Sequence, residues 1–218
     1  MYERLHLEDE DEFFRVSTGS LPDLEVVREV MTEAYARFAD ESSGKAADYI
    51  PALARVSPDL FGVSMVGVGG ADIGMGDCDH LFSIQSISKP FVFALVCQAL
   101  GAEGARARVG VNATGLPFNS VMAVELNADR TMNPMVNAGA IATTSCVPGA
   151  NAEEKFRFIQ DGLSRFAGRR LEVDEEVYTS EAETNLRNRG IAKLLEGYDR
   201  FFFNDPATTE IYTRQCSL

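Results

Sequence analysis

Ser86 and Lys89 are the residues of this chain whose types and spacing most directly suggest chemistry. Residues three positions apart on a helix share a face, so the amine of Lys89 can lie beside the hydroxyl of Ser86. A serine becomes a nucleophile when a neighbouring base takes its proton, and a deprotonated lysine can be that base. The pair therefore predicts nucleophilic catalysis of the kind that serine hydrolases use.

The surroundings of the pair carry more information than its spacing, because the same Ser-x-x-Lys pattern also occurs at residues 42–45. That second match lies where a helical pattern ends at a glycine, so its side chains would be neither held nor desolvated. Ser86 and Lys89 instead precede residues 90–100, which are apolar nearly all round and predict a buried helix that ends at Gly101. We therefore take Ser86 and Lys89 as the reactive pair.

Burial is what would make Lys89 a base at neutral pH. Lowering a lysine pKa from about 10.4 to about 7 corresponds to roughly 4.6 kcal/mol. The positive end of a helix contributes at most about 2 kcal/mol, so desolvation against the apolar helix must supply the larger share. The same helix N-terminus would point the backbone N–H of Ser86 at the reacting centre, as one donor of an oxyanion hole.

Composition excludes several classes of partner. The chain has 218 residues, a net charge of −13 and a pI near 4.6, which argues against nucleic acid or an anionic membrane surface as partners. A small neutral or zwitterionic ligand is compatible with this charge.

The 4 cysteines form no CxxC pair and only 2 histidines occur, so we expect reduced thiols and no zinc site. The compact cluster at residues 77–80 (Asp-Cys-Asp-His) has no second cluster to complete a metal site. The acidic N-terminus resembles no signal peptide and no span reaches transmembrane length, which predicts a cytoplasmic protein.

The pattern along the chain predicts one β-hairpin and many helices. Residues 1–19 form an acidic leader, and residues 20–218 form the domain. We expect a hairpin over residues 61–77, with glycines at the turn. The expected helices are a surface helix opened by a capping box at Ser20 and Asp23, one that starts at Pro134 after an Asn133 N-cap, one over residues 153–166, one from a capping box at Ser180 toward Glu196, and one from Pro206. Because a lone hairpin is not a stable sheet, strands are missing from this count.

Four segments of the chain together resemble the serine-dependent glutaminase family. They are residues 48–51 (Asp-Tyr-Ile-Pro), 82–89 (Phe-Ser-Ile-Gln-Ser-Ile-Ser-Lys), 133–141 (Asn-Pro-Met-Val-Asn-Ala-Gly-Ala-Ile) and 212–218 (Tyr-Thr-Arg-Gln-Cys-Ser-Leu). The third is far more specific than Ser-x-x-Lys. The resemblance covers roughly residue 20 to the end of the chain.

The resemblance implies an α+β fold of the serine β-lactamase/transpeptidase type, in which an antiparallel sheet is flanked by helices. It also implies hydrolysis of L-glutamine to L-glutamate and ammonia through a serine acyl-enzyme, without metal or cofactor. Carried over to this sequence, it makes Ser86 the nucleophile and Lys89 its base, with Tyr49 beside them. The substrate contacts would be Ser86, Asn137, Glu181, Asn188 and Tyr212. Glu181 and Asn188 are expected on one face of one helix, where they would suit the α-ammonium and α-carboxylate of an amino acid.

The sequence also departs from the family pattern. The superfamily has a Lys-Ser/Thr-Gly strand facing the nucleophile, and none of the lysines here precedes Ser-Gly or Thr-Gly. We therefore expect the closing C-terminal strands to be missing from this chain. Two alternatives to a glutaminase stay open: a penicillin-recognising serine hydrolase, and an inactive truncated fragment or pseudoenzyme that assembles with like chains. We further expect a homo-oligomer.

Overall fold

A computed structural model describes residues 22–67, 69–113, 115–128, 130, 132–199 and 208–218. Contacts divide the chain into two compact units, one formed by residues 1–44 with 59–80 and the other by residues 45–58 with 81–218. The acidic leader predicted at residues 1–19 lies outside the described residues, and the division at residue 20 stays a prediction.

The first unit contains the helix α1 (Leu24–Phe38) and the strands β1 (Gly62–Val66) and β2 (Asp72–Gly76). The two strands pair antiparallel, with Ser64 opposite Gly74, which confirms the predicted hairpin. In α1 only Met31 is buried, as expected of a surface helix. The helix begins after Asp23, whose side chain makes no capping hydrogen bond, and Ser20 lies outside the described residues. The unit is held by contacts such as the stacking of Tyr35 on Phe61, with ring centroids 5.0 Å apart.

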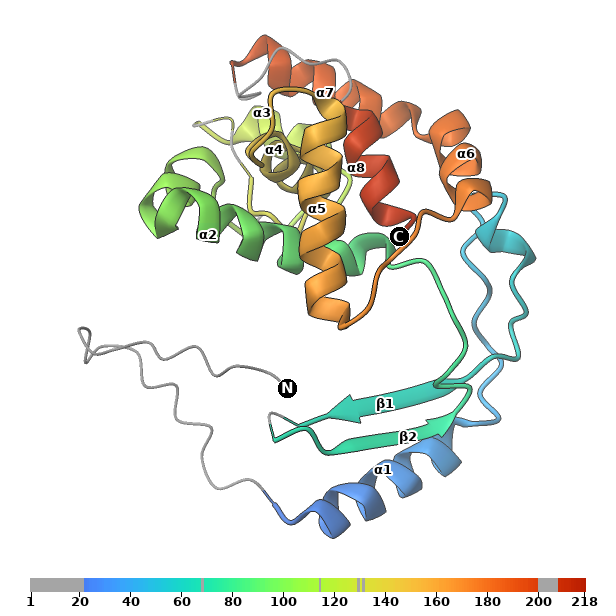
Figure 1. The fold of residues 1–218 in the computed structure, drawn as a ribbon. Helices are drawn as coiled ribbons and strands as arrows, with labels where there is room; N and C mark the ends of the chain where they lie inside the picture. The colour runs from blue at the N-terminus through green and yellow to red at the C-terminus, as the bar shows by residue number, and fades with distance from the viewer. Residues whose placement is uncertain (1–21, 68, 114, 129, 131, 200–207) are drawn as a thin grey trace, which may run out of the picture. The chain divides into compact units, whose positions relative to one another are not determined.

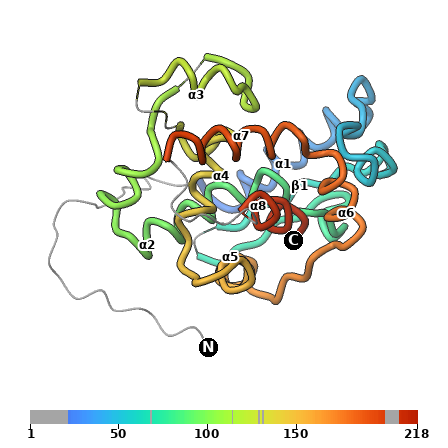
Figure 2. The backbone as a smooth tube through the Cα atoms, turned by 90° about the horizontal axis from the view of Figure 1, so that it is seen from above, coloured from blue at the N-terminus to red at the C-terminus, as the bar shows by residue number. Residues whose placement is uncertain are grey.

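The second unit is helical (Figures 1 and 2). Its short 3-10 turns are η1 (Leu53–Arg55) and η2 (Gln85–Ile87). Its α-helices are α2 (Ser88–Arg108), α3 (Met122–Leu126), α4 (Asn137–Ser145), α5 (Ala152–Ala167), α6 (Glu175–Thr184), α7 (Leu186–Gly197) and α8 (Thr208–Cys216). Helix α4 is central, since it packs against α2, α7 and α8.

The predicted helix after Lys89 is present, but Gly101 interrupts it rather than ending it. Gly101 adopts φ 72° and ψ 163°, a conformation that a residue with a Cβ rarely takes, and the helix resumes as far as Arg108. The first part of α2 carries the buried residues Val92, Leu95 and Val96. The apolar run of the sequence thus forms the buried segment that it predicts.

Helix α4 starts later than predicted. Asn133 and Pro134 do not open it; Val136 is its extended N-cap residue and Asn137 its first helical residue. The cause is local, because the Asn133 side chain accepts a hydrogen bond from the N–H of Met135 (3.0 Å) and stabilises a turn instead. The turn then comes so close to α4 that a Cβ at Gly139 would lie 1.8 Å from the Asn133 carbonyl oxygen. The small residues of the 133–141 segment therefore serve this close approach.

The prediction of one helix from Ser180 to Glu196 is wrong. Helix α6 begins earlier, after Asp174, whose carboxylate accepts hydrogen bonds from the N–H groups of Glu176 and Val177. The helical conformation breaks at Asn185, with φ −82° and ψ 30°, and α7 starts one residue later. By contrast, the predicted helix over residues 153–166 is confirmed as α5, with Gly168 as its left-handed C-cap. The predicted start of the last helix at Pro206 lies outside the described residues.

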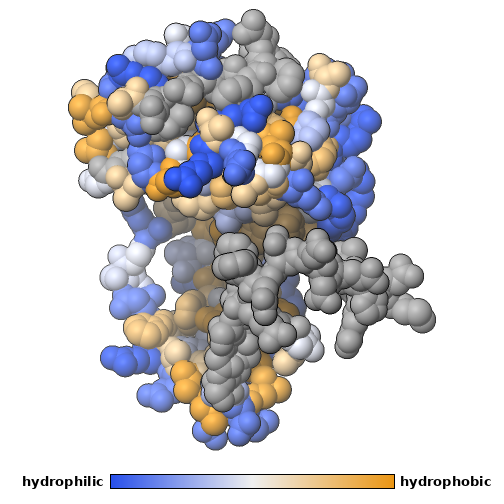
Figure 3. All heavy atoms as spheres, turned by 90° about the vertical axis from the view of Figure 1, so that its left-hand side faces the viewer, coloured by the Kyte–Doolittle hydropathy of each residue, from blue (hydrophilic) through white to orange (hydrophobic). Residues whose placement is uncertain are grey.

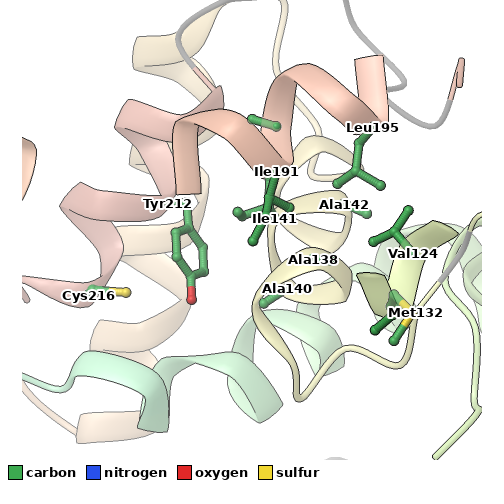
Figure 4. Packing of buried hydrophobic residues seen from close by; sticks show 12 residues of the cluster. Val124, Met132, Ala138, Ala140, Ile141, Ala142, Ile191, Leu195, Tyr212 and Cys216 are labelled. Atoms are coloured by element: carbon green, nitrogen blue, oxygen red, sulfur yellow. The ribbon is translucent and has the colours of Figure 1, made fainter. Parts of the chain in front are cut away.

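The two larger apolar clusters of the second unit hold its helices together. The first joins α4, α7 and α8 and includes Ile141, Ile191, Leu195 and Tyr212 (Figure 4). The second joins α2, α5 and α8 and includes Val96, Ile159 and Ile211. Helix α8 contributes to both, so it links the helix that follows Ser86 to the centre of the unit.

On the face of the molecule seen in Figure 3, hydrophilic and hydrophobic residues are interspersed. Single exposed apolar residues are normal in folded proteins. None of the helices in the described ranges is long and apolar enough to cross a membrane.

Candidate active site

The residues predicted to form a site come together around one cavity of the second unit. The cavity has a volume of about 320 Å³, the lower end of what small-molecule sites usually offer. Its walls include Tyr49, Ser86, Asn137, Glu181, Asn188 and Tyr212. Lys89 reaches the same place through a hydrogen bond to Asn137. Segments distant in the sequence therefore converge as predicted.

Ser86 sits in the 3-10 turn η2, and Lys89 is the second residue of α2. The turn is anchored from the other end of the chain, since the N–H of Ile84 donates to the carbonyl of Leu218 (2.8 Å). Only 5% of Lys89 is exposed, and burial lowers the pKa of its amine. This agrees with the prediction that desolvation by the apolar helix would make Lys89 a better base.

The hydrogen bonds of Lys89 differ from the expected pairing. Its Nζ donates to Oδ1 of Asn137 (2.8 Å) and to the carbonyl of Met135 (3.3 Å), and it lies 5.8 Å from the centre of the Phe118 ring. Among the hydrogen bonds of the described residues, none joins Lys89 to the hydroxyl of Ser86. In a site without substrate such a bond is often long or absent, so the position of Lys89 one turn from Ser86 still suits a base.

Hydrogen bonds connect Lys89 to Asn137 and Asn137 to Asn188, which lines the cavity. Asn137 accepts from Lys89 with Oδ1 and donates with Nδ2 to Oδ1 of Asn188 (3.0 Å). Both functions of the Asn137 amide are therefore used within the protein. Asn188 accepts through its oxygen, and no hydrogen bond within the described part of the chain uses its Nδ2 donors, which are therefore available to a ligand.

Glu181 is the most unusual group of the cavity. Glu181 is 6% exposed, and its carboxylate oxygen Oε2 is buried without a hydrogen-bond partner among the described residues. Burial raises the pKa of Glu181 to about 7, while a hydrogen bond with Gln85 partly opposes this rise. A buried carboxylate with a free oxygen is costly unless a ligand compensates it, and a cationic group is the ligand that would do so.

Glu181 and Asn188 do not share a helix face as predicted, because the break at Asn185 puts them on α6 and α7. Both nevertheless line the same cavity.

The two tyrosines occupy different environments. Tyr49 is 66% exposed, whereas Tyr212 is 2% exposed and packs in the cluster of α4, α7 and α8 (Figure 4). Desolvation raises the pKa of both, that of Tyr212 far above its usual value, so both hydroxyls are neutral. The loop that carries Tyr49 is held on α6, where the Ala52 N–H donates to the Ser180 hydroxyl (3.0 Å).

Several wall residues were not singled out from the sequence. They include Gln85, Phe118, Arg187 and Cys216. Burial raises the pKa of the Cys216 thiol to about 12, so it is a neutral wall group rather than a nucleophile. Gln85 precedes the nucleophile candidate and Arg187 precedes Asn188, and no spacing rule marks either of them. Among the described residues, no group of three or more His, Cys, Asp or Glu side chains could hold a metal ion.

A model of the glutaminase family matches residues 44–218, a span that includes every residue of this site. The chain belongs to the glutaminase family. It is 56% identical over 203 residues to Glutaminase 2 of Yersinia pestis, covering 93% of this chain and 60% of that protein. It is 48% identical over 197 residues to a glutaminase of Colwellia psychrerythraea, covering 90% of this chain and 63% of that protein. The chain thus spans about three fifths of the length of these relatives.

Solved structures of family members have the same fold. Probable glutaminase ybaS matches with a TM-score of 0.86 and 38% identity over 90% of this chain and 63% of that one. A probable glutaminase from Bacillus subtilis, complexed with 6-diazo-5-oxo-L-norleucine, matches with a TM-score of 0.72 and 32% identity over 92% of this chain and 61% of that one. The predicted α+β class with a β-lactamase-like fold is confirmed by these neighbours, and the hairpin with its helices agrees with it.

Proposed function

We propose that the protein is a glutaminase that hydrolyses the side-chain amide of L-glutamine to L-glutamate and ammonia. The observation that carries this proposal is Glu181, a buried carboxylate with an unpartnered oxygen in the cavity that Ser86 lines. A cationic α-ammonium would compensate that carboxylate. Family membership supports the same substrate.

In the proposed reaction, Lys89 takes the proton of Ser86 as the serine Oγ attacks the amide carbon of the substrate. The tetrahedral intermediate collapses when the carbon–nitrogen bond breaks and the nitrogen receives the proton that Lys89 holds, which releases ammonia and leaves a γ-glutamyl ester on Ser86. Water then attacks the ester and frees glutamate and the serine hydroxyl. The N–H of Ser86 would donate to the oxyanion, and Tyr49, which lines the same cavity, would lie beside the pair.

The substrate contacts are proposed from the same cavity. Glu181 would bind the α-ammonium, the free Nδ2 group of Asn188 would donate to the α-carboxylate, and Asn137 would hold both Lys89 and Asn188 in place. Tyr212 would contribute a neutral hydroxyl from the buried wall. The Bacillus subtilis neighbour supports an amino-acid ligand, because 6-diazo-5-oxo-L-norleucine is an L-amino acid with a carbonyl at the side-chain position where glutamine has one.

An assay of ammonia release tests the proposal and its main rival together. We expect ammonia from L-glutamine and no hydrolysis of a chromogenic cephalosporin, which a penicillin-recognising hydrolase would open. Cephalosporin hydrolysis without ammonia release would favour the rival. Absence of both would favour an inactive assembly partner.

We also propose a cytoplasmic location and a homo-oligomeric state. The location is supported by Cys78, Cys97, Cys146 and Cys216, all of which are free thiols, as is usual in a reducing compartment. Light scattering of the purified protein would test the second proposal: a mass equal to one chain would contradict it.

A further inference from the structure

The last turn of α8 holds the turn of Ser86 from both sides. Two residues before Ser86, the N–H of Ile84 donates to the carbonyl of Leu218 (2.8 Å). Two residues after it, the hydroxyl of Ser88 accepts from Nε2 of Gln215 (3.4 Å). Helix α8 and the turn η2 are in contact, and Figure 1 shows the end of α8 beside the start of α2. The position of Ser86 therefore depends on α8 as well as on α2.

The backbone directly before Ser86 is strained. Gln85 adopts φ 48°, in the left-handed region that residues with a Cβ rarely occupy. A conformation of this kind persists only where the surrounding structure holds it in place. The two contacts with α8 lie on either side of Gln85 and supply that restraint. The loss of either contact would let the turn relax and would displace Ser86.

Gln215 connects three helices through its side-chain amide. Its Nε2 donates to Ser88 at the start of α2, and its Oε1 accepts from the hydroxyl of Thr144 on α4 (3.1 Å). Gln215, Ser88 and Thr144 are all buried. An amide bonded at both ends in the interior fixes the spacing of the helices that it joins, because a shift of either helix would leave a buried polar group unpaired.

Helices α2 and α4 also carry Lys89 and its hydrogen-bond acceptor. Lys89 follows Ser88 on α2 and donates to Asn137, the first residue of α4 (2.8 Å). Asn137 and Thr144 are seven residues apart, which is two turns, so they lie on one face of α4. The two helices are thus linked twice along this face. The first link holds the amine of Lys89, and the second, through Gln215, holds the turn that carries Ser86.

We propose that Gln215 is a positioning residue for the reaction, and that it acts through Ser88 to hold Ser86 where Lys89 can take its proton. Gln215 is not among the wall residues of the cavity, so the substrate would not touch it. This inference rests on the proposed roles of Ser86 and Lys89. The family resemblance gives Gln215 no role.

The reaction of Ser86 with 6-diazo-5-oxo-L-norleucine tests this role on the whole chain. Attack of the serine oxygen on the diazo carbon forms a carbon–oxygen bond and releases dinitrogen, while the serine proton passes to that carbon. The product is a stable ether, which mass spectrometry detects at Ser86. The dependence of the rate on the concentration of the compound gives its affinity, KI, and its maximal rate, kinact, separately.

Two variants break the link between α8 and α2 from opposite sides. Gln215→Leu removes both hydrogen bonds of the amide, and Ser88→Ala removes the hydroxyl that accepts one of them. Gln160→Leu is the matched control, because Gln160 is also a buried glutamine, whose Nε2 donates to the carbonyl of Leu171 (2.9 Å). The control loses a buried amide of the same kind on α5 and leaves the turn of Ser86 unchanged.

We expect Gln215→Leu to lower kinact about tenfold or more and to change KI less than about twofold, since a small displacement of a reacting group costs rate rather than binding. Ser88→Ala should slow the reaction in the same way. The double variant should be no slower than the slower single variant, because both changes break one link. Gln160→Leu should match the wild type in kinact although its melting temperature falls.

Three outcomes for the variants would overturn the proposal. The first is a kinact within about twofold of the wild type in Gln215→Leu or in Ser88→Ala. The second is an equal loss in Gln160→Leu, which would mean that lower stability alone slows the reaction. The third is a multiplied loss in the double variant, which would mean that Gln215 acts by another route. A wild type that forms no adduct at Ser86 would also overturn the proposal, since Gln215 would have no nucleophile to position.

Ammonia release from L-glutamine, measured in parallel, separates the positioning role from the glutaminase function. Adduct formation that depends on Gln215, without any ammonia release, would contradict only the glutaminase proposal. Ammonia release by the wild type, with an unchanged kinact in Gln215→Leu, would contradict only the positioning role.

Discussion

The substitution Glu181→Gln should stabilise the folded protein and, at the same time, weaken its binding of free L-glutamine. The residue is 6% exposed, and burial raises its pKa from a usual 4.5 to about 7. Ionising the carboxyl in the folded protein therefore costs roughly 3 kcal/mol more than in the unfolded chain. Glutamine at this position has nearly the same shape and never ionises.

The sign of the pH dependence follows from this raised pKa. Between pH 4.5 and about 7 the folded protein holds a proton on Glu181 that the unfolded chain has lost, so wild-type stability falls as pH rises through this window. The stability advantage of Glu181→Gln should be near zero below pH 4.5 and should reach roughly 3 kcal/mol above pH 7. Chemical denaturation at several pH values measures it. Glu183→Gln, an exposed change on the same helix, is the control and should show no such growth.

Glu181→Gln should also change the affinity for ligands. Loss of a charge-assisted hydrogen bond to the α-ammonium, worth roughly 1.5 to 3 kcal/mol, should weaken glutamine binding about ten- to a hundredfold. Binding of 4-carbamoylbutanoate, which is glutamine without its α-amino group, should not weaken. In the wild type, glutamine affinity should fall as pH drops below about 7 and Glu181 takes up its proton. Equal stability of the two proteins at pH 8, together with unchanged glutamine affinity, would refute the role given to Glu181.

Three further substitutions test the base and the packing of α2 against α5. Lys89→Met should abolish ammonia release, and Lys89→Arg should not recover at any pH, because a guanidinium does not deprotonate in a protein; recovery of Lys89→Arg at high pH in a rate–pH profile would count against Lys89 as the base. The wild-type rate should rise with pH as Lys89 loses its proton, at a pH below the usual lysine value of 10.5 because burial lowers its pKa. Gly162→Ala should destabilise the protein by about 1 to 3 kcal/mol, since the new Cβ would lie 2.3 Å from Cδ1 of Leu95; a thermal melt no lower than the wild type's would show that α2 and α5 are not tightly packed there.

Local patterns predicted the elements whose cause is local. The apolar run after Lys89 predicted a buried helix, and the glycines between two β-rich segments predicted a hairpin; both are present. The family segments predicted that Ser86, Asn137 and Tyr212 would meet at one cavity, which periodicity alone could not have done.

The predicted helix boundaries near the site were wrong where a side-chain hydrogen bond favours a start of the helix at another residue. Asn133 has the composition of an N-cap, but its side chain stabilises a turn that delays α4 to Asn137. Asp174 caps α6 ahead of Ser180, the residue favoured from the sequence. Both are local side-chain hydrogen bonds, and the spacing of residue types does not reveal which of two possible capping residues forms them.

The most direct test of the central claim is a comparison of ammonia release from L-glutamine by the wild type and by Ser86→Ala, with binding measured on both. Removing the attacking oxygen should abolish turnover and leave glutamine affinity nearly unchanged, because the substrate contacts stay in place. A wild type that hydrolyses glutamine while Ser86→Ala keeps a rate within tenfold of it would contradict the assignment of Ser86 as the nucleophile.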